Sequence, residues 1–300
     1  MENVPYLGEG LALLSPLAWS VAVILFKKTG ERVPAIALSL FKNTLACALF
    51  VATFVALGSA MPEEHSWRDI ALLLFSGVLG IALADGLFFV CLNRLGAGRQ
   101  AIINTAYSPP IIFLSVIFLG ERLTPWQVLG VLLILFAVVS VGATKGRDGR
   151  RPPALFSGLL AGLGACFSQA ISIVMIKAHM AAWPLLWMTS WRVGGGLAAT
   201  LLVLPFLKPS ARSLRSLGDR RVWKFMLPAV LVGTYVSLLA WMGGFKFADA
   251  SVASALNQTS TLFTFLLAVV ILKEPVTRRG LLGLSLGVVG VALVTFLGAG

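Results

Sequence analysis

The chain has 300 residues, of which 58% are hydrophobic and 12% are charged, and its mean hydropathy is +0.92. Soluble chains carry about 25% charged residues, so this composition excludes a soluble two-domain protein and a disordered chain. The net charge is nevertheless +12, from 24 Lys and Arg against 12 Asp and Glu. The basic residues form short clusters between long apolar runs, which favours a membrane protein with basic loops over a nucleic-acid-binding protein. We therefore expect a lipid bilayer as a partner, and no nucleic acid.

Ten apolar segments follow one another along the chain, each close to the 20 or so residues that cross a bilayer as a helix. The N-terminus lacks the basic region of a cleavable signal peptide, so the first segment is expected to be a membrane helix. The predicted class is an all-α integral membrane protein with ten transmembrane helices. The segments are approximately Leu7–Phe26, Val33–Leu57, Arg68–Leu92, Ala97–Leu119, Pro125–Ala143, Ala154–Ile176, Trp183–Phe206, Val222–Phe245, Ala250–Leu272 and Thr277–Leu297.

The basic residues divide unequally between the two ends of these helices. Eighteen of the 24 lie in alternate joints, at positions 27–32, 94–99, 145–151, 208–224 and 273–279. Four lie in the opposite joints, and Lys42 and Arg192 lie inside helices. Because Lys and Arg gather on the cytoplasmic side, the first end is predicted to be cytoplasmic and both termini to lie outside. The expected location is the cytoplasmic (inner) membrane of a bacterium.

The two halves of the chain match each other. At an offset of 153, Asn104 corresponds to Asn257 and Glu121 to Glu274, and at an offset of 150, Lys42 corresponds to Arg192. We predict a five-helix repeat at 1–144, a cytoplasmic linker at 145–153 and a second five-helix repeat at 154–300. Since five is odd, the second repeat enters the bilayer from the opposite side. Such inverted repeats are typical of secondary transporters, although a duplication retained only for packing is the alternative.

The joints resemble those of a known family. Residues 120–124 (GERLT), 273–277 (KEPVT) and 256–261 (LNQTST), together with the two five-helix halves, resemble the EamA-type branch of the drug/metabolite transporter superfamily. The resemblance covers nearly the whole chain and implies a central cavity surrounded by helices one to four and six to nine, with helices five and ten peripheral. It implies transport of small solutes without naming one. The resemblance to many members implies an N-terminus inside the cell. The charge distribution of this chain instead predicts that the N-terminus lies outside.

Three ionisable residues lie within predicted helices, where each costs at least about 2.5 kcal/mol unless it is paired or functional. Lys42 and Asp85 are both about 12–14 Å from the same face, so they are predicted to pair. The two residues form either a permanent ion pair or a coupling element in which Asp85 takes up a proton or Lys42 binds an anion. The third alternative is that each side chain extends separately toward the membrane surface. Arg192 has Leu238 where a counterpart of Asp85 would stand. It is predicted to bind a carboxylate or phosphate of the substrate, with hydrogen bonds to helix ends or to Ser168 and Gln169 as the alternative.

Amide and aromatic side chains complete the predicted substrate site. Asn104 and Asn257 occupy equivalent positions in the fourth and ninth helices, where amides either line a wet cavity or join helices. The candidate substrate-binding residues are Arg192, Asn104, Asn257, Trp19, Tyr107, Gln169 and Trp241, and the candidate coupling residues are Asp85 and Lys42. For each single aromatic residue, packing is the competing interpretation.

Other conspicuous residues are predicted to be structural. Trp67, Trp126 and Trp183 suit an interfacial aromatic belt, and Glu274 suits the N-terminus of the helix that follows it. The three cysteines lie in apolar runs and suggest packing, and the two histidines form no metal cluster.

The predicted function is secondary active transport of a small organic metabolite, an amino-acid-like or carboxylate-bearing solute, by alternating access and in the direction of export. The chain contains no GxxxxGK[ST] motif for ATP hydrolysis, and no cofactor is expected. Coupling is either to protons through Asp85 or absent, and the protein is expected to be a monomer or a homodimer. The alternatives are efflux of cationic drugs, which Lys42 and Arg192 disfavour, a membrane enzyme, and a non-transporting scaffold.

Overall fold

A computed structural model describes residues 6–57, 66–119, 124–142, 154–177, 179, 183–207, 216–247 and 250–296. The described residues form helices and their connections. The elements are α1 (Leu7–Gly30), α2 (Ala35–Ala56), α3 (Trp67–Gly77), η1 (Val78–Leu83), α4 (Ala84–Leu95), α5 (Ala97–Asn104), η2 (Thr105–Tyr107), α6 (Ser108–Leu119), α7 (Pro125–Gly142), α8 (Leu155–Lys177), α9 (Leu185–Leu207), η3 (Ser216–Gly218), α11 (Arg220–Ala229), η4 (Val230–Val236), α12 (Ser237–Phe247), α13 (Ala250–Leu272) and α14 (Arg278–Phe296).

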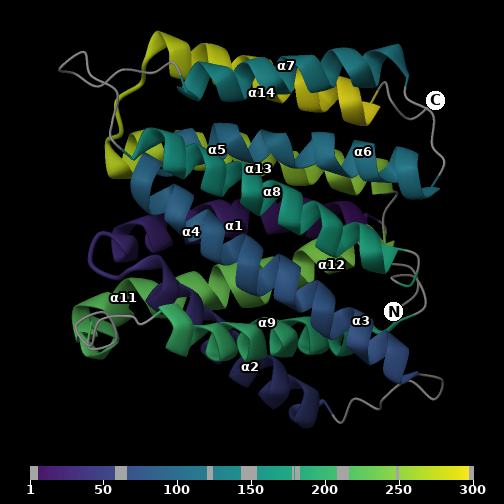
Figure 1. The fold of residues 1–300 in the computed structure, drawn as a ribbon, viewed down its shortest axis with the longest axis vertical. Helices are drawn as coiled ribbons and strands as arrows, with labels where there is room; N and C mark the ends of the chain where they lie inside the picture. The colour runs from purple at the N-terminus through teal and green to yellow at the C-terminus, as the bar shows by residue number, and fades with distance from the viewer. Residues whose placement is uncertain are drawn as a thin grey trace.

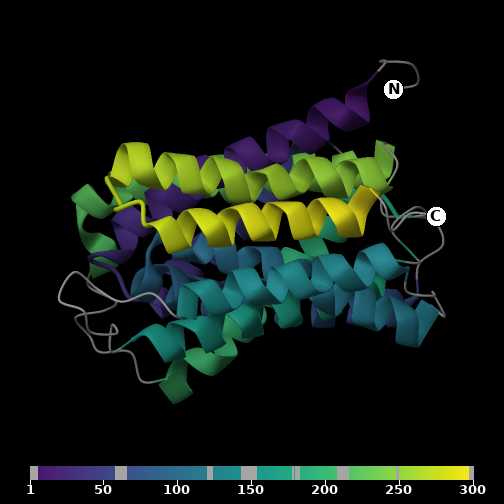
Figure 2. The ribbon, with the colours of Figure 1, turned by 90° about the horizontal axis from the view of Figure 1, so that it is seen from above.

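Each of the ten predicted segments corresponds to one helix or one run of consecutive helices. The runs are α3–η1–α4, α5–η2–α6 and α11–η4–α12. Figures 1 and 2 show the helices lying roughly along one common axis, with α1 beginning and α14 ending at the same end of the molecule. The all-α class and the ten-helix architecture are therefore confirmed. The linker predicted at 145–153 lies outside the described residues.

Equivalent helices of the two halves make equivalent contacts. Helix α1 packs against α12 and α13 of the second half, and its counterpart α8 packs against α4 and α6 of the first half. The counterparts α2 and α9 contact each other, as do α7 and α14, which lie together at one edge of the bundle (Figure 1). In Figure 1, α1 and α8 run in opposite directions, as expected for inverted repeats.

The outer surface is apolar over wide areas. Phe206, Val55, Phe156, Leu202 and Phe136 have exposed fractions between 63% and 83%. Five described helices are long and apolar enough to cross a membrane, and one of them, Trp67–Leu95, combines 29 residues with a mean hydropathy of 2.1. In water such a surface would aggregate. In a bilayer it is the surface that contacts lipid.

A π-helical segment interrupts the same helix in both repeats. It spans Val78–Leu83 in the first repeat and Val230–Val236 in the second, and the offset of 153 carries residues 78–83 onto 231–236. A π-helical turn adds a residue to each hydrogen-bonded ring and is found mostly at functional sites. Asp85 follows the first π-helical segment by two residues, so this irregularity sets the direction in which Asp85 faces.

Close backbone contacts fix α9 against α3. A Cβ atom on Gly77 would lie 1.9 Å from the carbonyl oxygen of Arg192, and a Cβ atom on Gly195 would lie 2.3 Å from the carbonyl oxygen of Leu74. Only glycine permits this approach. The backbone of α9 at Arg192 is therefore held in direct contact with α3.

Two joints show how the helix ends are stabilised. Thr124 and Gln127 form a reciprocal capping box at the start of α7, with N···O distances of 2.9 and 3.2 Å. Glu274 accepts hydrogen bonds from the backbone N–H groups of Ala97 at 2.8 Å and Gly98 at 2.9 Å. Glu274 was predicted to serve the helix that follows it, α14, but it caps α5 instead. It thereby joins the end of α13 to the start of α5, and its repeat counterpart Glu121 lies outside the described residues.

One of the three interfacial tryptophans was assigned wrongly. Trp67 and Trp126 are 82% and 50% exposed, as a belt residue would be. Trp183 is only 5% exposed, because its ring stacks on His179 at a centroid distance of 4.7 Å and packs against Trp187. Trp183 is therefore part of the protein interior.

Candidate functional site

A cavity of about 230 Å³ lies between the two repeats. Its lining comes from α1, α2, η1 with α4, α5 with η2, α8, α9, η4 with α12, and α13. In the described parts of α7 and α14 no residue lines it. Helices one to four and six to nine thus surround the cavity while five and ten stay outside, as the family resemblance implied. A space enclosed by both repeats is where alternating-access transporters bind their substrates.

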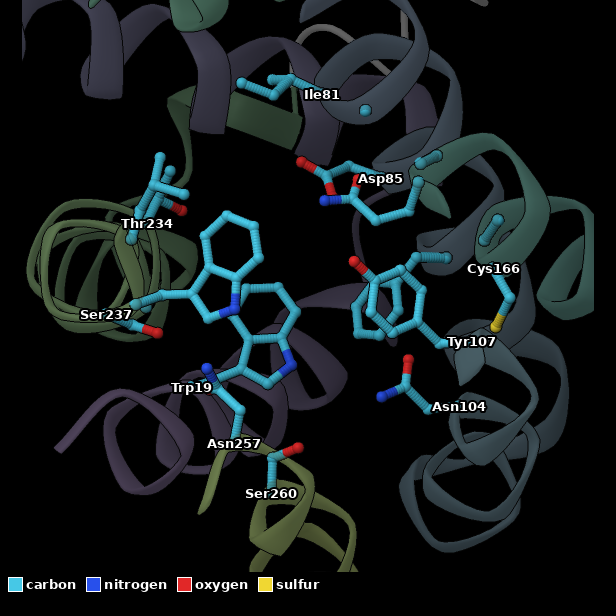
Figure 3. A pocket seen from close by; sticks show the side chains of 18 of the residues that line it. Trp19, Ile81, Asp85, Asn104, Tyr107, Cys166, Thr234, Ser237, Asn257 and Ser260 are labelled. Carbon is cyan, nitrogen blue, oxygen red and sulfur yellow. The ribbon is translucent and has the colours of Figure 1, made fainter. Parts of the chain in front are cut away.

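All nine candidate residues line this cavity. They are Arg192, Asn104, Asn257, Trp19, Tyr107, Gln169, Trp241, Asp85 and Lys42. Figure 3 shows Asp85, Trp19, Tyr107, Asn104 and Asn257 arranged around one common space, although they come from five different helical segments. The sequence therefore identified residues that are neighbours in space, while their roles in binding and coupling stay predictions.

Lys42 and Asp85 form an ion pair on one wall of the cavity. The Nζ atom of Lys42 lies 2.7 Å from Oδ2 of Asp85, and the two side chains are 3% and 23% exposed. Their similar depth in α2 and α4 explains why they meet. Asp85 is therefore partly open to the cavity, whereas Lys42 is almost fully buried.

Arg192 approaches the same space from α9, without an ion-pair partner. Its residue is 3% exposed, and no carboxylate oxygen of a described residue lies within 4 Å of it. Nη2 donates a hydrogen bond to Ser172 Oγ at 3.0 Å, and Nη1 donates a weak one to Met242 Sδ at 4.0 Å. Nε is buried with no partner among the described residues. Tyr107 and Asp85 are near enough to interact electrostatically with the guanidinium. The guanidinium is thus a buried cation that retains unused hydrogen-bonding capacity.

The serine that holds Arg192 was not anticipated from the sequence. Ser172 Oγ donates to the carbonyl oxygen of Ser76 at 2.7 Å, which fixes it as an acceptor for Arg192. Ser168, one of the two expected partners, instead donates to the carbonyl oxygen of Leu79 at 2.8 Å. Gln169 lines the cavity beside Arg192. The position of Arg192 therefore depends on the α3–α8 contact.

Amide groups from both repeats line the cavity, on the contacting helices α5 and α13. Asn257 Nδ2 is buried without a partner among the described residues. Its neighbour Gln258 donates from Nε2 to Ser108 Oγ at 3.0 Å, which joins α13 to the start of α6.

Pro109 follows Ser108 directly, and the α-helical pattern before it gives way to the 3-10 turn η2, where Tyr107 lies. The prolines interrupt the α-helical hydrogen bonds here because they lack an N–H group, and this places Tyr107 at the cavity.

Aromatic rings form much of the apolar wall. Trp19 and Phe88 are in contact at a centroid distance of 5.5 Å with an interplanar angle of 47°, and Trp241 lines the cavity as well. Tyr235, an aromatic residue of η4 in the second repeat, is hydrogen-bonded to Thr53 and does not line the cavity. The cavity thus offers apolar rings beside amides and charged groups, which suits a solute with both characters.

Several lining residues carried no sequence signal. They are small or singly polar residues that look like ordinary helix-packing positions in an apolar run: Ser15, Gln100, Cys91, Cys166, Thr234 and Ser237. Ser15 and Ser237 are hydrogen-bonded at 3.3 Å across α1 and α12, and Thr234 Oγ1 is buried without a partner among the described residues. The two cysteines were expected only to pack, and they pack and line the cavity.

Comparison with known proteins decides the family. The model of the EamA-like transporter family matches the chain twice, at residues 6–143 and 156–296. The chain belongs to the EamA-like transporter family. It is therefore a multi-pass membrane transporter and not an enzyme, and its partners include a lipid bilayer and a small-molecule solute.

Relatives of this EamA-like protein carry transporter names without a substrate. An uncharacterized transporter of Archaeoglobus fulgidus is 23% identical over 92% of the chain and 94% of its own length. The uncharacterized transporters YvbV and YetK of Bacillus subtilis are 29% and 25% identical, over 78% and 90% of the chain and 76% and 81% of their own lengths. A crystal structure of a protein 20% identical in sequence superposes with a TM-score of 0.68 and covers 97% of each chain, which supports the fold.

Proposed function

We propose that this EamA-like transporter exports a small organic metabolite that carries a carboxylate, such as an amino acid, across the bacterial cytoplasmic membrane by alternating access. The observation that carries the proposal is the buried guanidinium of Arg192, which faces the cavity with Nε unused and without a carboxylate partner among the described residues. A planar guanidinium matches a carboxylate with two parallel hydrogen bonds. A ligand carboxylate would satisfy the group that the protein leaves incomplete.

The charges along the cavity support an anionic or zwitterionic solute. The charged lining residues are Lys42, Asp85 and Arg192, two cations and one carboxylate. This leaves one excess positive charge that a ligand carboxylate neutralises. An ammonium group of the same ligand can approach Asp85 or the faces of Trp19 and Trp241. Efflux of a cationic drug is disfavoured by the same excess charge.

Transport by the purified protein in proteoliposomes tests the proposal. Counterflow is measured with labelled amino acids, dicarboxylates and organic cations, and the best substrate is then compared with its carboxamide. We expect Arg192→Gln to weaken binding of the carboxylate at least tenfold and to leave binding of the carboxamide unchanged, because only the carboxylate uses the guanidinium. Arg94→Gln, an exposed cation outside the cavity, serves as the matched control. Unchanged carboxylate affinity in a folded Arg192→Gln variant would contradict the proposed site, and flux of organic cations alone would favour drug efflux.

We further propose that Asp85 couples transport to protons by exchanging Lys42 for a proton. Its partial exposure to the cavity, beside an otherwise buried Lys42, supports this role. Net transport is measured with substrate on one side of the membrane only. We expect an imposed pH difference to change this flux in the wild type and to have no effect on it in Asp85→Asn. If the pH difference does not change the flux of either protein, although both still exchange substrate across the membrane, proton coupling is contradicted. The protein would then be an uncoupled exchanger.

A further inference from the structure

A second hollow, here called the basic groove, lies at the end of the molecule where the basic joints gather. It has a volume of about 340 Å³. Its cationic residues are Lys28 and Arg32, at and after the end of α1, and Arg221 in the first turn of α11. The end of α13, at Ile271 and Leu272, completes it. The groove therefore touches the first repeat through α1 and the second repeat through α11 and α13.

Among the described residues, the cations of the basic groove outnumber the carboxylates beside them. Glu31 is the one carboxylate among the lining residues, against three cations. No ion pair within 4 Å joins these groups in the described part of the chain. Lys28 lies over the ring of Phe225 at 5.6 Å from its centroid, which holds the ammonium at the groove without removing its charge. The groove thus presents a net positive charge on a fixed scaffold.

The remaining wall of the basic groove is apolar and faces outward. Ile271 is 45% exposed, and Phe225 and Leu272 are half-buried. Trp223 lies outside the groove but only two residues before Phe225 on α11, at a similar height along the helix; it is 46% exposed and packs edge-on against Phe41 of α2. Tryptophan favours the boundary between lipid headgroups and acyl chains. The groove therefore lies at that boundary, with cations toward the headgroups and apolar side chains toward the acyl chains.

We propose that the basic groove binds the phosphate headgroup of an anionic phospholipid, with one acyl chain against Ile271 and Leu272. Basic pockets between transmembrane helices bind anionic headgroups, and each nearby cation strengthens the attraction. A soluble anion would use the cations but would leave the apolar wall exposed. Because the lipid touches both repeats, it stabilises the arrangement of α1, α11 and α13 described above. This site is separate from the central cavity, so it does not depend on the identity of the transported solute.

Thermal unfolding of the purified full chain in detergent tests the proposal, with phosphatidylglycerol, phosphatidylcholine or inorganic phosphate added in turn. We expect phosphatidylglycerol to raise the unfolding temperature saturably and the other two to have no effect. Lys28→Gln/Arg32→Gln/Arg221→Gln is expected to weaken the apparent affinity for phosphatidylglycerol by at least tenfold, given roughly fivefold for each cation. The control Arg94→Gln/Arg99→Gln/Arg278→Gln removes as much charge outside the groove and is expected to keep wild-type affinity.

The outcomes separate a lipid site from other causes. An equal shift with inorganic phosphate would show a site for a soluble anion and overturn the lipid proposal. Equal losses in the two triple variants would show a general charge effect and would overturn it as well. If the groove variant does not fold, Arg221→Gln alone is titrated, with an expected loss of about fivefold. Native mass spectrometry of the wild type is expected to show one phosphatidylglycerol retained in preference to phosphatidylcholine, and no preference contradicts the site.

Discussion

Lys42 and Arg192 show how a duplicated cation has acquired two different surroundings. They occupy equivalent positions in the repeats, and both are almost fully buried, with exposed fractions of 2% and 3%. Lys42 is paired with Asp85, but the residue equivalent to Asp85 in the second repeat is Leu238. Arg192 therefore relies on neutral acceptors, Ser172 Oγ and the more distant Met242 Sδ. This asymmetry leaves one cation available for a ligand and one held by the protein.

The Lys42–Asp85 pair provides a stability prediction. Removing one partner of a buried ion pair leaves an uncompensated charge and costs about 3–5 kcal/mol. We expect Lys42→Met to lower the free energy of unfolding by about 3 kcal/mol, toward the lower limit because Asp85 is 23% exposed. The double variant Lys42→Met/Asp85→Asn is expected to recover most of that loss, because no charge is left behind.

Denaturant unfolding in detergent, followed by tryptophan fluorescence, measures this double-mutant cycle. The coupling free energy between the two substitutions is the quantity of interest. A coupling near zero, with the double variant as unstable as the sum of the single variants, would show that the ion pair contributes nothing to folding.

The sequence predicted the pair but not the partner of Arg192, for a physical reason. Charges within apolar helices are few, so depth alone matches Lys42 with Asp85. Serines are common in such helices and usually bond to their own backbone, as Ser190 does to the carbonyl oxygen of Leu186 at 2.7 Å. Nothing in the sequence separates Ser172 from them. Its position opposite Ser76 arises from helix packing that the sequence pattern does not specify.

At the scale of helices, the crossing of α3 and α9 fixes the backbone of Arg192, while its guanidinium is held by Ser172 of α8. Gly195 meets the backbone of Leu74, and backbone atoms cannot rotate away as side chains do. Gly194, the preceding residue on the same helix, has nothing within 4 Å of the position of its Cβ atom. The chain thus offers two adjacent glycines with opposite surroundings.

This pair gives a controlled prediction. We expect Gly195→Ala to separate α3 from α9, to lower the free energy of unfolding by about 1–3 kcal/mol and to reduce transport, because Arg192 moves with α9. Gly194→Ala is expected to be neutral or slightly stabilising, since alanine favours the helix by about 1 kcal/mol. Unfolding temperature and counterflow are measured for both variants. Similar behaviour of the two would refute the role assigned to the crossing.

Helices were the most predictable elements, and their irregularities the least. A run of about 20 apolar residues between turn and charge signals suffices to locate a membrane helix. The π-helical segments at Val78–Leu83 and Val230–Val236 had no comparable signal, since their sequences are as apolar as their surroundings. The same limit explains Trp183. Its position at a helix start suggested an interface, while its burial depends on the tertiary contacts with His179 and Trp187.

At the scale of the whole molecule, the repeats combine symmetry of architecture with asymmetry of chemistry. The contacts of α1 and α8 with the opposite half are equivalent. Under the proposed alternating access, exchanging the conformations of the repeats would move access from one end of the cavity to the other. The charged lining residues do not follow this symmetry. The proposed carrier would therefore have two similar shapes and one oriented binding site.

The orientation of the molecule follows from its two unequal ends. One end of the molecule is formed by the C-termini of α1 and α13 and the N-termini of α2, α5, α11 and α14 (Figure 1). At the opposite end, α1 begins and α14 finishes. In the sequence, 18 of the 24 basic residues fall in the joints predicted for the end where α1 and α13 finish. By the tendency of Lys and Arg to remain in the cytoplasm, we predict that this end faces the cytoplasm and that both termini face outward.

Reporter fusions in bacterial cells test this orientation. Alkaline phosphatase, which is active only outside the cytoplasm, is expected to be active when fused after Gly300, whereas green fluorescent protein at that position is expected to be dark. Fusions within the predicted linker, after Arg150, are expected to give the reverse pattern, because an odd number of helices separates the two sites. The reverse result at both positions would place the basic end outside. Glutamine in place of Lys145, Arg147, Arg150 and Arg151 then provides a graded test, since loss of four basic residues should increase the fraction of inverted molecules if the charge asymmetry determines orientation.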